Sequence, residues 1–353
     1  MKIRAIFFIS SVIGLLAFYS CSSAPQVRNM KVYDGYAQGT TFHIVYDSVA
    51  GNLNGKIDSV FRDIDASMSL YDSSSLICKF NNSEEGTMVD KHFYEVFLLS
   101  KNIHQITEGA FNPAVYPLVK LWGFGPNRFH EDSVKNKDSK ADSLLQFTHF
   151  EDLEFDSSKS NPSQNQYFIA KKKRKNMLDF NGIAQGYTVD VISELFEKNG
   201  IANYMIEVGG EVKAKGINVQ GKTWRIGIDK PVEETDKRVL QAIVNLENLA
   251  LATSGSYRKF YIKDGKRYSH TIEPFTGKPV KHNLLSVSVF TPSCARADGL
   301  ATAFMVMGSQ KAVDFIRKNT DVQIYMISSG AANDYQIYMS PGMDKFIESV
   351  QQQ

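Results

Sequence analysis

The chain has 353 residues, of which 43% are hydrophobic, 22% charged and 12% aromatic. This is the composition of a folded protein with a large core, and it excludes a disordered chain. The 40 Lys and Arg residues against 38 Asp and Glu give a formal net charge of +2, which lacks the basic excess of a nucleic-acid-binding protein. We therefore expect no nucleic-acid partner, and we interpret the basic run 171–175 as a solvated strand end.

The first twenty residues differ from the rest of the chain. Two basic residues precede an apolar run over 5–19, which has the pattern of a signal peptide and is short for a membrane span. Cys21 follows a small residue, as at a bacterial lipoprotein cleavage site. We expect 1–20 to be a signal peptide, 21–30 a tether and Cys21 a lipidated residue. The protein would then be an exported, membrane-anchored lipoprotein facing the periplasm; plain secretion and an uncleaved anchor are the alternatives.

Two further cysteines, Cys78 and Cys294, are far apart in the sequence. Two cysteines are too few for a disulfide framework. The sequence also lacks the Cys-x-x-Cys motif that would indicate a zinc site. Free buried thiols are the expectation, with a single bridge as the alternative.

From residue 31 onward, strand and helix patterns follow one another without an internal repeat. Alternation of apolar and polar residues predicts a strand pair over 31–46, and helical spacing predicts helices over 54–67 and 93–107. Later segments with the same kinds of pattern are a helix over 139–148, a short strand at 177–180, a helix over 187–198, strands over 204–208, 224–228 and 239–246, helices over 299–307 and 310–318, and strands over 323–328 and 335–339. The order lacks regular βαβ alternation, so it favours an α+β fold over a doubly wound sheet.

Two stretches carry the candidate chemistry. In the first, small residues over 181–186 separate the short strand from a helix, which allows a ligand to approach the backbone closely. In the second, Asp298 and Thr302 lie four residues apart in a helical run and therefore share one face. A carboxylate and a hydroxyl suit Mg²⁺. The alternative is that Asp298 caps the helix and Thr302 bonds to its own backbone.

His270 lies between a strand pattern and the turn 273–277, and its residue type alone leaves a structural and a functional role open. The sequence has no Gly-x-Ser-x-Gly elbow and no His-Glu-x-x-His motif. Their absence argues against the common serine hydrolase and zinc protease plans.

Eight segments in chain order resemble the ApbE family of flavin transferases. They are GTTFHI at 39–44, MSLYD at 68–72, GAFNPAVYPLVKLWGFG at 109–125, LDFNGIAQGYTVD at 178–190, EVGGEV at 207–212, ATSGSYRKFY at 252–261, KRYSHTIEPFTGKPV at 266–280 and ADGLATAFMVMG at 297–308. The resemblance implies a single α+β domain over 31–353, with two lobes and the flavin site in the cleft between them.

The resemblance also implies an activity: with Mg²⁺ bound, FMN is transferred from FAD to a Thr or Ser hydroxyl of an acceptor protein, and AMP is released. The implied acceptors are subunits of membrane redox complexes. Two alternatives stay open. One is an FAD pyrophosphatase that gives free FMN and AMP, and the other is a lipoprotein that binds FAD without chemistry.

The implied site residues fall into three groups. The Mg²⁺ ligands are Asp298, Thr302 and the carbonyl of Ala184, and the catalytic residues are His270 and Asp298. The residues expected to contact FAD are Met68, Tyr71, Phe111, Trp122, Phe124, Ser254, Gly255, Tyr257, His270 and Thr276.

Overall fold

The computed structural model describes residues 29–126, 137–231, 239–256, 260–263, 266–269, 271–330 and 334–348, with only the backbone given over 260–263 and 266–269. The predicted signal peptide, Cys21, Tyr257 and His270 lie outside the described residues. Within the described part of the chain, no helix has the length and apolar character needed to cross a membrane.

An antiparallel sheet of eight strands forms the centre of the fold, in the order β1-β2-β6-β7-β10-β13-β14-β15. These strands are β1 (Met30–Ala37), β2 (Thr40–Asp47), β6 (Tyr204–Val208), β7 (Glu211–Lys215), β10 (Leu249–Gly255), β13 (Leu284–Thr291), β14 (Gln323–Ser329) and β15 (Tyr335–Met339). Seven of the eight residues of β13 are buried, because layers pack on both faces of the sheet.

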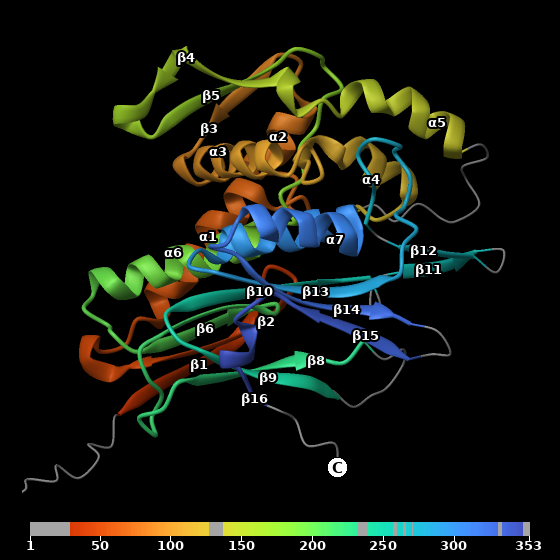
Figure 1. The fold of residues 1–353 in the computed structure, drawn as a ribbon. Helices are drawn as coiled ribbons and strands as arrows, with labels where there is room; N and C mark the ends of the chain where they lie inside the picture. Colours follow the sequence, from red (N-terminus) through yellow and green to blue (C-terminus); the bar gives the residue numbers. More distant parts are fainter. Residues whose placement is uncertain are drawn as a thin grey trace, which may run out of the picture.

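The helices cover one face of this sheet in two layers (Figure 1). They are α1 (Asn54–Met68), α2 (Leu76–Asn82), α3 (Lys91–Ile106), α4 (Tyr116–Trp122), α5 (Lys137–Leu144), α6 (Ala184–Lys198) and α7 (Cys294–Lys318). Figure 1 shows α6 and α7 next to the sheet, and α7 contacts β10 and β13 directly. The largest core cluster lies between α3, α7 and the sheet, and includes Phe93, Phe97 and Phe304.

Smaller sheets lie beyond these layers. One, of β3 (Gly86–Val89), β5 (Gln166–Lys171) and β4 (Leu153–Asn161), lies on the far side of the helices, and another, of β8 (Trp224–Asp229), β9 (Leu240–Leu246) and β16 (Ile347–Glu348), covers the opposite face of the central sheet (Figure 1). A third sheet pairs β11 (Phe260–Lys263) with β12 (Lys266–Ser269). The α+β class is confirmed, while the division into two lobes stays a prediction.

Most predicted helices are present, with one correction in α7. The expected helices over 299–307 and 310–318 form one element that already begins at Cys294, and the non-helical Gly308 (φ 75°) kinks it between the two predicted pieces. The helix predicted over 187–198 also begins earlier, at Ala184. In both cases the first turn is stabilised by contacts with distant parts of the chain, which local spacing does not reveal.

The short strand predicted at 177–180 is wrong, because these residues pair with no strand. The side chain of Asn81 takes the place of a neighbouring strand: its amide nitrogen donates to the carbonyl of Leu178 at 2.8 Å, and its oxygen accepts from the Leu178 N–H at 2.7 Å. The N–H of Asp179 then donates to the carbonyl of Pro113 at 2.9 Å. The segment is held in place without being part of a sheet.

Residues 216–223 read GINVQGKT, which has the residue spacing of a phosphate-binding P-loop. In the fold they connect strand β7 to strand β8. A P-loop binds phosphate at the N-terminus of the helix that follows it, and here a strand follows. The match therefore marks a loop between strands of two different sheets and no P-loop.

Candidate active site

Two glycines allow the start of α6 to lie against α7. A Cβ atom at Gly186 would lie 2.5 Å from the carbonyl oxygen of Cys294 and 2.8 Å from the Cβ of Asp298. A Cβ at Gly182 would lie 2.9 Å from the hydroxyl oxygen of Thr302. Real side chains do not tolerate contacts this short, so the 181–186 segment meets α7 only because these positions are glycine.

The contact brings together the residues predicted from the two sequence stretches. The N–H of Gly186 donates to Oδ2 of Asp298 at 3.1 Å, and the hydroxyl of Thr302 lies 3.4 Å from the carbonyl oxygen of Gly182. Asp298 is only 5% exposed, and this burial raises the pKa of its carboxyl group to about 7, against the opposing effect of the Gly186 hydrogen bond. A buried carboxylate with so few donors is held at a free-energy cost that a cation would relieve.

The alternative interpretation of Asp298 and Thr302 is not supported. Ser293 is the N-cap of α7, since its side chain accepts from the N–H of Arg296, and Asp298 lies inside the helix. The Thr302 hydroxyl contacts the 181–186 segment rather than its own helix. Both side chains therefore lie on one face of α7, as their four-residue spacing predicts, and this face meets the 181–186 segment.

The oxygen atoms gathered here fit a hard divalent cation. A carboxylate, a hydroxyl and a backbone carbonyl are the donors that Mg²⁺ prefers, and Mg²⁺ usually completes its shell with water or phosphate. The carbonyl in contact with Thr302 is that of Gly182, whereas the Ala184 carbonyl accepts from the Thr188 hydroxyl at 2.8 Å. Among the described residues no group of three or more His, Cys, Asp and Glu side chains forms a metal site, so a cation here would depend on hydroxyl and carbonyl oxygens beside a single carboxylate.

Asp190 fixes the start of α7 and was not singled out from the sequence. Its carboxylate accepts from the Ser293 hydroxyl at 2.8 Å and from the N–H groups of Cys294 and Ala295 at 3.1 and 3.0 Å. Lys213 on β7 donates to the same carboxylate at 2.8 Å. Asp190 lies on α6 and holds the first N–H groups of α7, so it sets the position of the buried carboxylate one turn later.

Cys78 and Cys294 are both free, as expected, but only Cys294 is buried, and Cys78 is partly exposed. Burial raises the pKa of the Cys294 thiol well above its usual value, and nearby carboxylates, including Asp190, raise it further. The thiol therefore stays protonated and is no nucleophile.

The turn at 273–277 docks on the corner formed by 109–125. The indole N–H of Trp122 donates to the carbonyl of Gly277 at 2.7 Å, and Trp122 is 5% exposed. The ring of Phe275 lies 3.3 Å from the position that a Cβ would take at Gly109. Thr276 donates its hydroxyl to Glu273 at 2.6 Å within the turn. Two segments that the sequence resemblance placed in one site are thus in contact.

Replacing Trp122 with Phe removes this buried hydrogen bond and leaves the Gly277 carbonyl unpaired. We expect a loss of about 1–3 kcal/mol in the free energy of unfolding, together with weaker FAD binding because the turn after residue 270 loosens. Trp224→Phe is the matched control, because the Trp224 indole on β8 makes the same kind of bond to the Lys215 carbonyl on β7 at 3.1 Å. Urea unfolding and FAD titration compare the two variants; equal FAD affinities would contradict the positional role of Trp122.

The other predicted FAD contacts differ in exposure. Met68 and Phe111 are buried in the largest core cluster, at 4% and 3% exposed, while the Tyr71 ring is 73% exposed. Phe124 packs partly buried against Trp122 and its neighbours. Ser254 and Gly255, both partly exposed, form the end of β10 beside β13. For all of these residues the contact with FAD stays a prediction.

Asp179 is a second carboxylate that was not selected from the sequence, although it belongs to the quoted 178–190 motif. Burial raises its pKa to about 6, against the hydrogen bond that its side chain accepts from the N–H of Asn181 at 2.8 Å. Burial also raises the pKa of Tyr116 to about 12, and the charges of Asp179, Cys78 and Tyr71 add to the effect. The carboxylate therefore lies between the aromatic corner and the start of α6.

Comparison with known proteins agrees with this geometry. The model of the ApbE family matches residues 38–326. An FAD:protein FMN transferase from Haemophilus influenzae is 32% identical over 90% of this chain and 92% of its own length, and one from Vibrio cholerae is 35% identical over 83% and 86%. The chain belongs to the ApbE family.

Solved structures give the same result. The flavin transferase ApbE from Vibrio cholerae superposes with a TM-score of 0.78 at 33% identity, covering 90% of this chain and 99% of that chain. The apo form of the flavinyl transferase ApbE from Pseudomonas stutzeri has a TM-score of 0.78 at 28% identity, covering 90% and 96%.

Proposed function

We propose that this protein transfers FMN from FAD to a Thr or Ser hydroxyl of an acceptor protein in an Mg²⁺-dependent reaction that releases AMP. The observation that carries the proposal is the buried Asp298 carboxylate, facing Thr302 and the 181–186 segment in a chain of the ApbE family. Relatives that cover most of the chain carry the name FAD:protein FMN transferase.

In the proposed step, the acceptor hydroxyl oxygen forms a bond to the phosphorus of the FMN half of FAD. The bond from that phosphorus to the bridging oxygen of the pyrophosphate breaks, and AMP leaves with the bridging oxygen. The hydroxyl proton passes to a base. Asp298, Thr302 and the Ala184 carbonyl would hold Mg²⁺, the carbonyl through the lone pair that the Thr188 hydroxyl does not use. The bound ion would neutralise the phosphate charge.

We assign the base, or the group that orients the phosphate, to His270. The residue lies outside the described part of the chain, and the support for the assignment is its place just before the turn that Trp122 holds at Gly277. General acid–base catalysis contributes about 10²- to 10⁴-fold, so His270→Ala is expected to lower the transfer rate by that factor and to flatten the pH profile near neutrality. His149→Ala, an exposed histidine elsewhere, is the control. Transfer by His270→Ala at the wild-type rate across pH would leave the residue with a structural role.

Transfer, hydrolysis and storage give different products. An acceptor incubated with the protein, FAD and Mg²⁺ is expected to gain the mass of FMN less one water, as measured by mass spectrometry. Free FMN and AMP beside an unmodified acceptor would support the pyrophosphatase instead. Unaltered FAD after long incubation would support an FAD-binding lipoprotein.

We further propose that the protein acts outside the cytoplasm, anchored through a lipidated Cys21. The support is the apolar run over 5–19, with a cysteine after a small residue. Subunits of membrane redox complexes with flavin sites on the same side of the membrane would then be its acceptors.

A further inference from the structure

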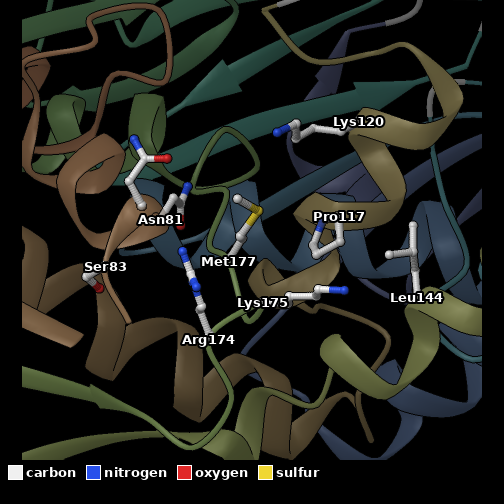
Figure 2. Close-up of a pocket in the computed structure, with 9 residues that line it drawn as sticks. Asn81, Ser83, Pro117, Lys120, Leu144, Arg174, Lys175 and Met177 are labelled. Atoms are coloured by element: carbon white, nitrogen blue, oxygen red, sulfur yellow. The ribbon is translucent and has the colours of Figure 1, made fainter. Parts of the chain in front are cut away.

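A pocket of about 360 Å³ opens between α2, α4, α5 and the segment that follows β5 (Figure 2). Apolar atoms of Pro117, Leu144 and Met177 form part of its lining. The pocket does not include Asp298, Thr302 or any residue predicted to contact FAD. It belongs to a part of the surface that the proposed chemistry does not use.

Positive charge surrounds this apolar floor. Lys120, Arg174 and Lys175 line the pocket, and Figure 2 shows the Met177 side chain between Lys120 and Arg174. No Asp or Glu is among the described residues that line it. Arg174 pairs with Glu84 at 3.0 Å, but both side chains are about 70% exposed, at 73% and 69%, so solvent screens this pair. The pocket is therefore complementary to negative charge.

A buried lysine stiffens one wall. Lys171 is 8% exposed, and its ammonium group donates to the carbonyls of Asn81, Ser83 and Arg174 at 3.3, 3.1 and 3.5 Å. These bonds tie the end of α2 to the segment that carries Arg174 and Lys175. The Arg174 and Lys175 side chains thus project from a backbone that is already fixed. Less conformational entropy is then lost when a ligand binds.

The pocket lies close to the candidate active site along the chain. Met177 lines the pocket, Asp179 follows two residues later, and the Gly182 carbonyl meets Thr302. Five residues span at most about 18 Å even when fully extended. Pro117 follows Tyr116, and the charge of Asp179 helps to raise the pKa of the Tyr116 phenol group. Tyr116 and Asp179 are therefore close to each other. Met177 and Gly182 are therefore at most about 18 Å apart, a distance that about five extended residues of a bound chain can cover.

We propose that this pocket binds an acidic segment of the acceptor protein. An apolar side chain of the acceptor would lie on Pro117, Leu144 and Met177, and carboxylates on either side of it would face the three cations. Because five extended residues span about 18 Å, the hydroxyl that receives FMN would lie about five residues along the acceptor chain from the bound acidic residues. The inference rests on the proposed FMN transfer and specifies how the acceptor is recognised.

Labelled synthetic peptides test this assignment. One peptide carries a leucine between two aspartates with a threonine five residues further on, and its partner carries asparagines in place of the aspartates. Because two aspartates are replaced, the acidic peptide gains two screened charge pairs over its partner, and it is expected to bind about tenfold more tightly by fluorescence anisotropy. Added salt is expected to remove most of this preference.

The variant K120Q/R174Q/K175Q removes the three positive charges and leaves polar, unbranched side chains that are shorter than the originals. It is expected to lose the preference for the acidic peptide, and its KM for peptide flavinylation should rise about tenfold, while kcat and FAD affinity stay at the wild-type values. The control K198Q/K318Q removes charge from exposed helix ends that do not line the pocket and should keep the preference. Thermal unfolding of both variants checks that they fold.

The outcomes separate this inference from the proposed function. Equal binding of both peptides to the wild type, or an unchanged preference in the pocket variant, would overturn the pocket assignment while transfer stays intact. Weaker FAD binding in the pocket variant would also overturn it, because the pocket would then belong to the nucleotide. Complete absence of FMN transfer by the wild type would instead contradict the proposed function.

Discussion

Asp298→Asn is expected to abolish Mg²⁺-dependent FMN transfer and, at the same time, to make the metal-free protein more stable above neutral pH. The amide oxygen can still accept the hydrogen bond from Gly186, so the packing between α6 and α7 is kept. The amide carries no charge, so the site keeps only neutral oxygen ligands. Without a carboxylate these ligands bind Mg²⁺ too weakly to hold it. Transfer is expected to fall by at least about 10³-fold, which corresponds to about 4 kcal/mol of lost stabilisation.

The gain in stability follows from the raised pKa. The Asp298 carboxyl has a pKa of about 7 in the folded protein against 3.8 for its ordinary value. Because the folded state holds this proton more tightly than the unfolded state, stability falls as pH rises from about 4 to about 7, by up to about 1.4 kcal/mol per pH unit. The cost then stays constant at higher pH, at an upper bound on the order of 4 kcal/mol.

Unfolding in EDTA measures this effect. The free energy of unfolding of Asp298→Asn should exceed that of the wild type at pH 8, and the difference should vanish near pH 4. Added Mg²⁺ should stabilise the wild type and leave the variant unchanged. A variant that is less stable than the wild type at pH 8 without metal would mean that the carboxylate has a stabilising partner other than a cation.

Gly186→Ala is expected to damage both the fold and the site. The new Cβ would lie 2.5 Å from the Cys294 carbonyl oxygen and 2.8 Å from the Cβ of Asp298, so α6 and α7 must move apart. Overpacking of this kind costs about 1–3 kcal/mol. Displacement of the carboxylate from Thr302 and the 181–186 segment should lower transfer by about 100-fold, since an error of about 1 Å in position has that effect.

Gly55→Ala is the matched control for this substitution. Gly55 lies in α1 with no other heavy atom within 4 Å of an added Cβ, and alanine favours a helix over glycine by about 1 kcal/mol. The control should therefore be slightly more stable and fully active. Denaturant unfolding and transfer assays compare the two; a Gly186→Ala protein with wild-type activity would show that the close contact of α6 and α7 is not needed.

Local periodicity predicted the parts of the fold that depend on local sequence. The strand pair over 31–46 is β1 and β2, the helix over 54–67 is α1, and β6 coincides with the predicted 204–208. The four-residue spacing of Asp298 and Thr302 placed both side chains on one helix face, and their contacts with Gly186 and Gly182 agree with it.

The features that local patterns missed depend on residues far apart in sequence. Asp190 caps α7 across more than 100 residues, and Trp122 reaches the Gly277 carbonyl across 155. The predicted strand at 177–180 failed because the Asn81 side chain, 97 residues earlier, takes up the backbone groups of Leu178. The spacing of apolar and polar residues within a segment gives no information on contacts with residues far away in the sequence. The glycines of the 181–186 segment were recognised as permissive for close approach. Local patterns did not show which helix would approach them, and only the family resemblance placed Ala184 beside Asp298 and Thr302.

The most direct test of the proposed function is the intact mass of an acceptor protein co-expressed with this enzyme. With the wild type, the acceptor should carry the added mass of FMN less one water, located on a Thr or Ser residue. With Asp298→Asn, expressed at the same level and folded, the added mass should be absent. An acceptor flavinylated equally by both proteins would contradict the central role of the buried carboxylate, and an acceptor flavinylated by neither would contradict the transfer itself.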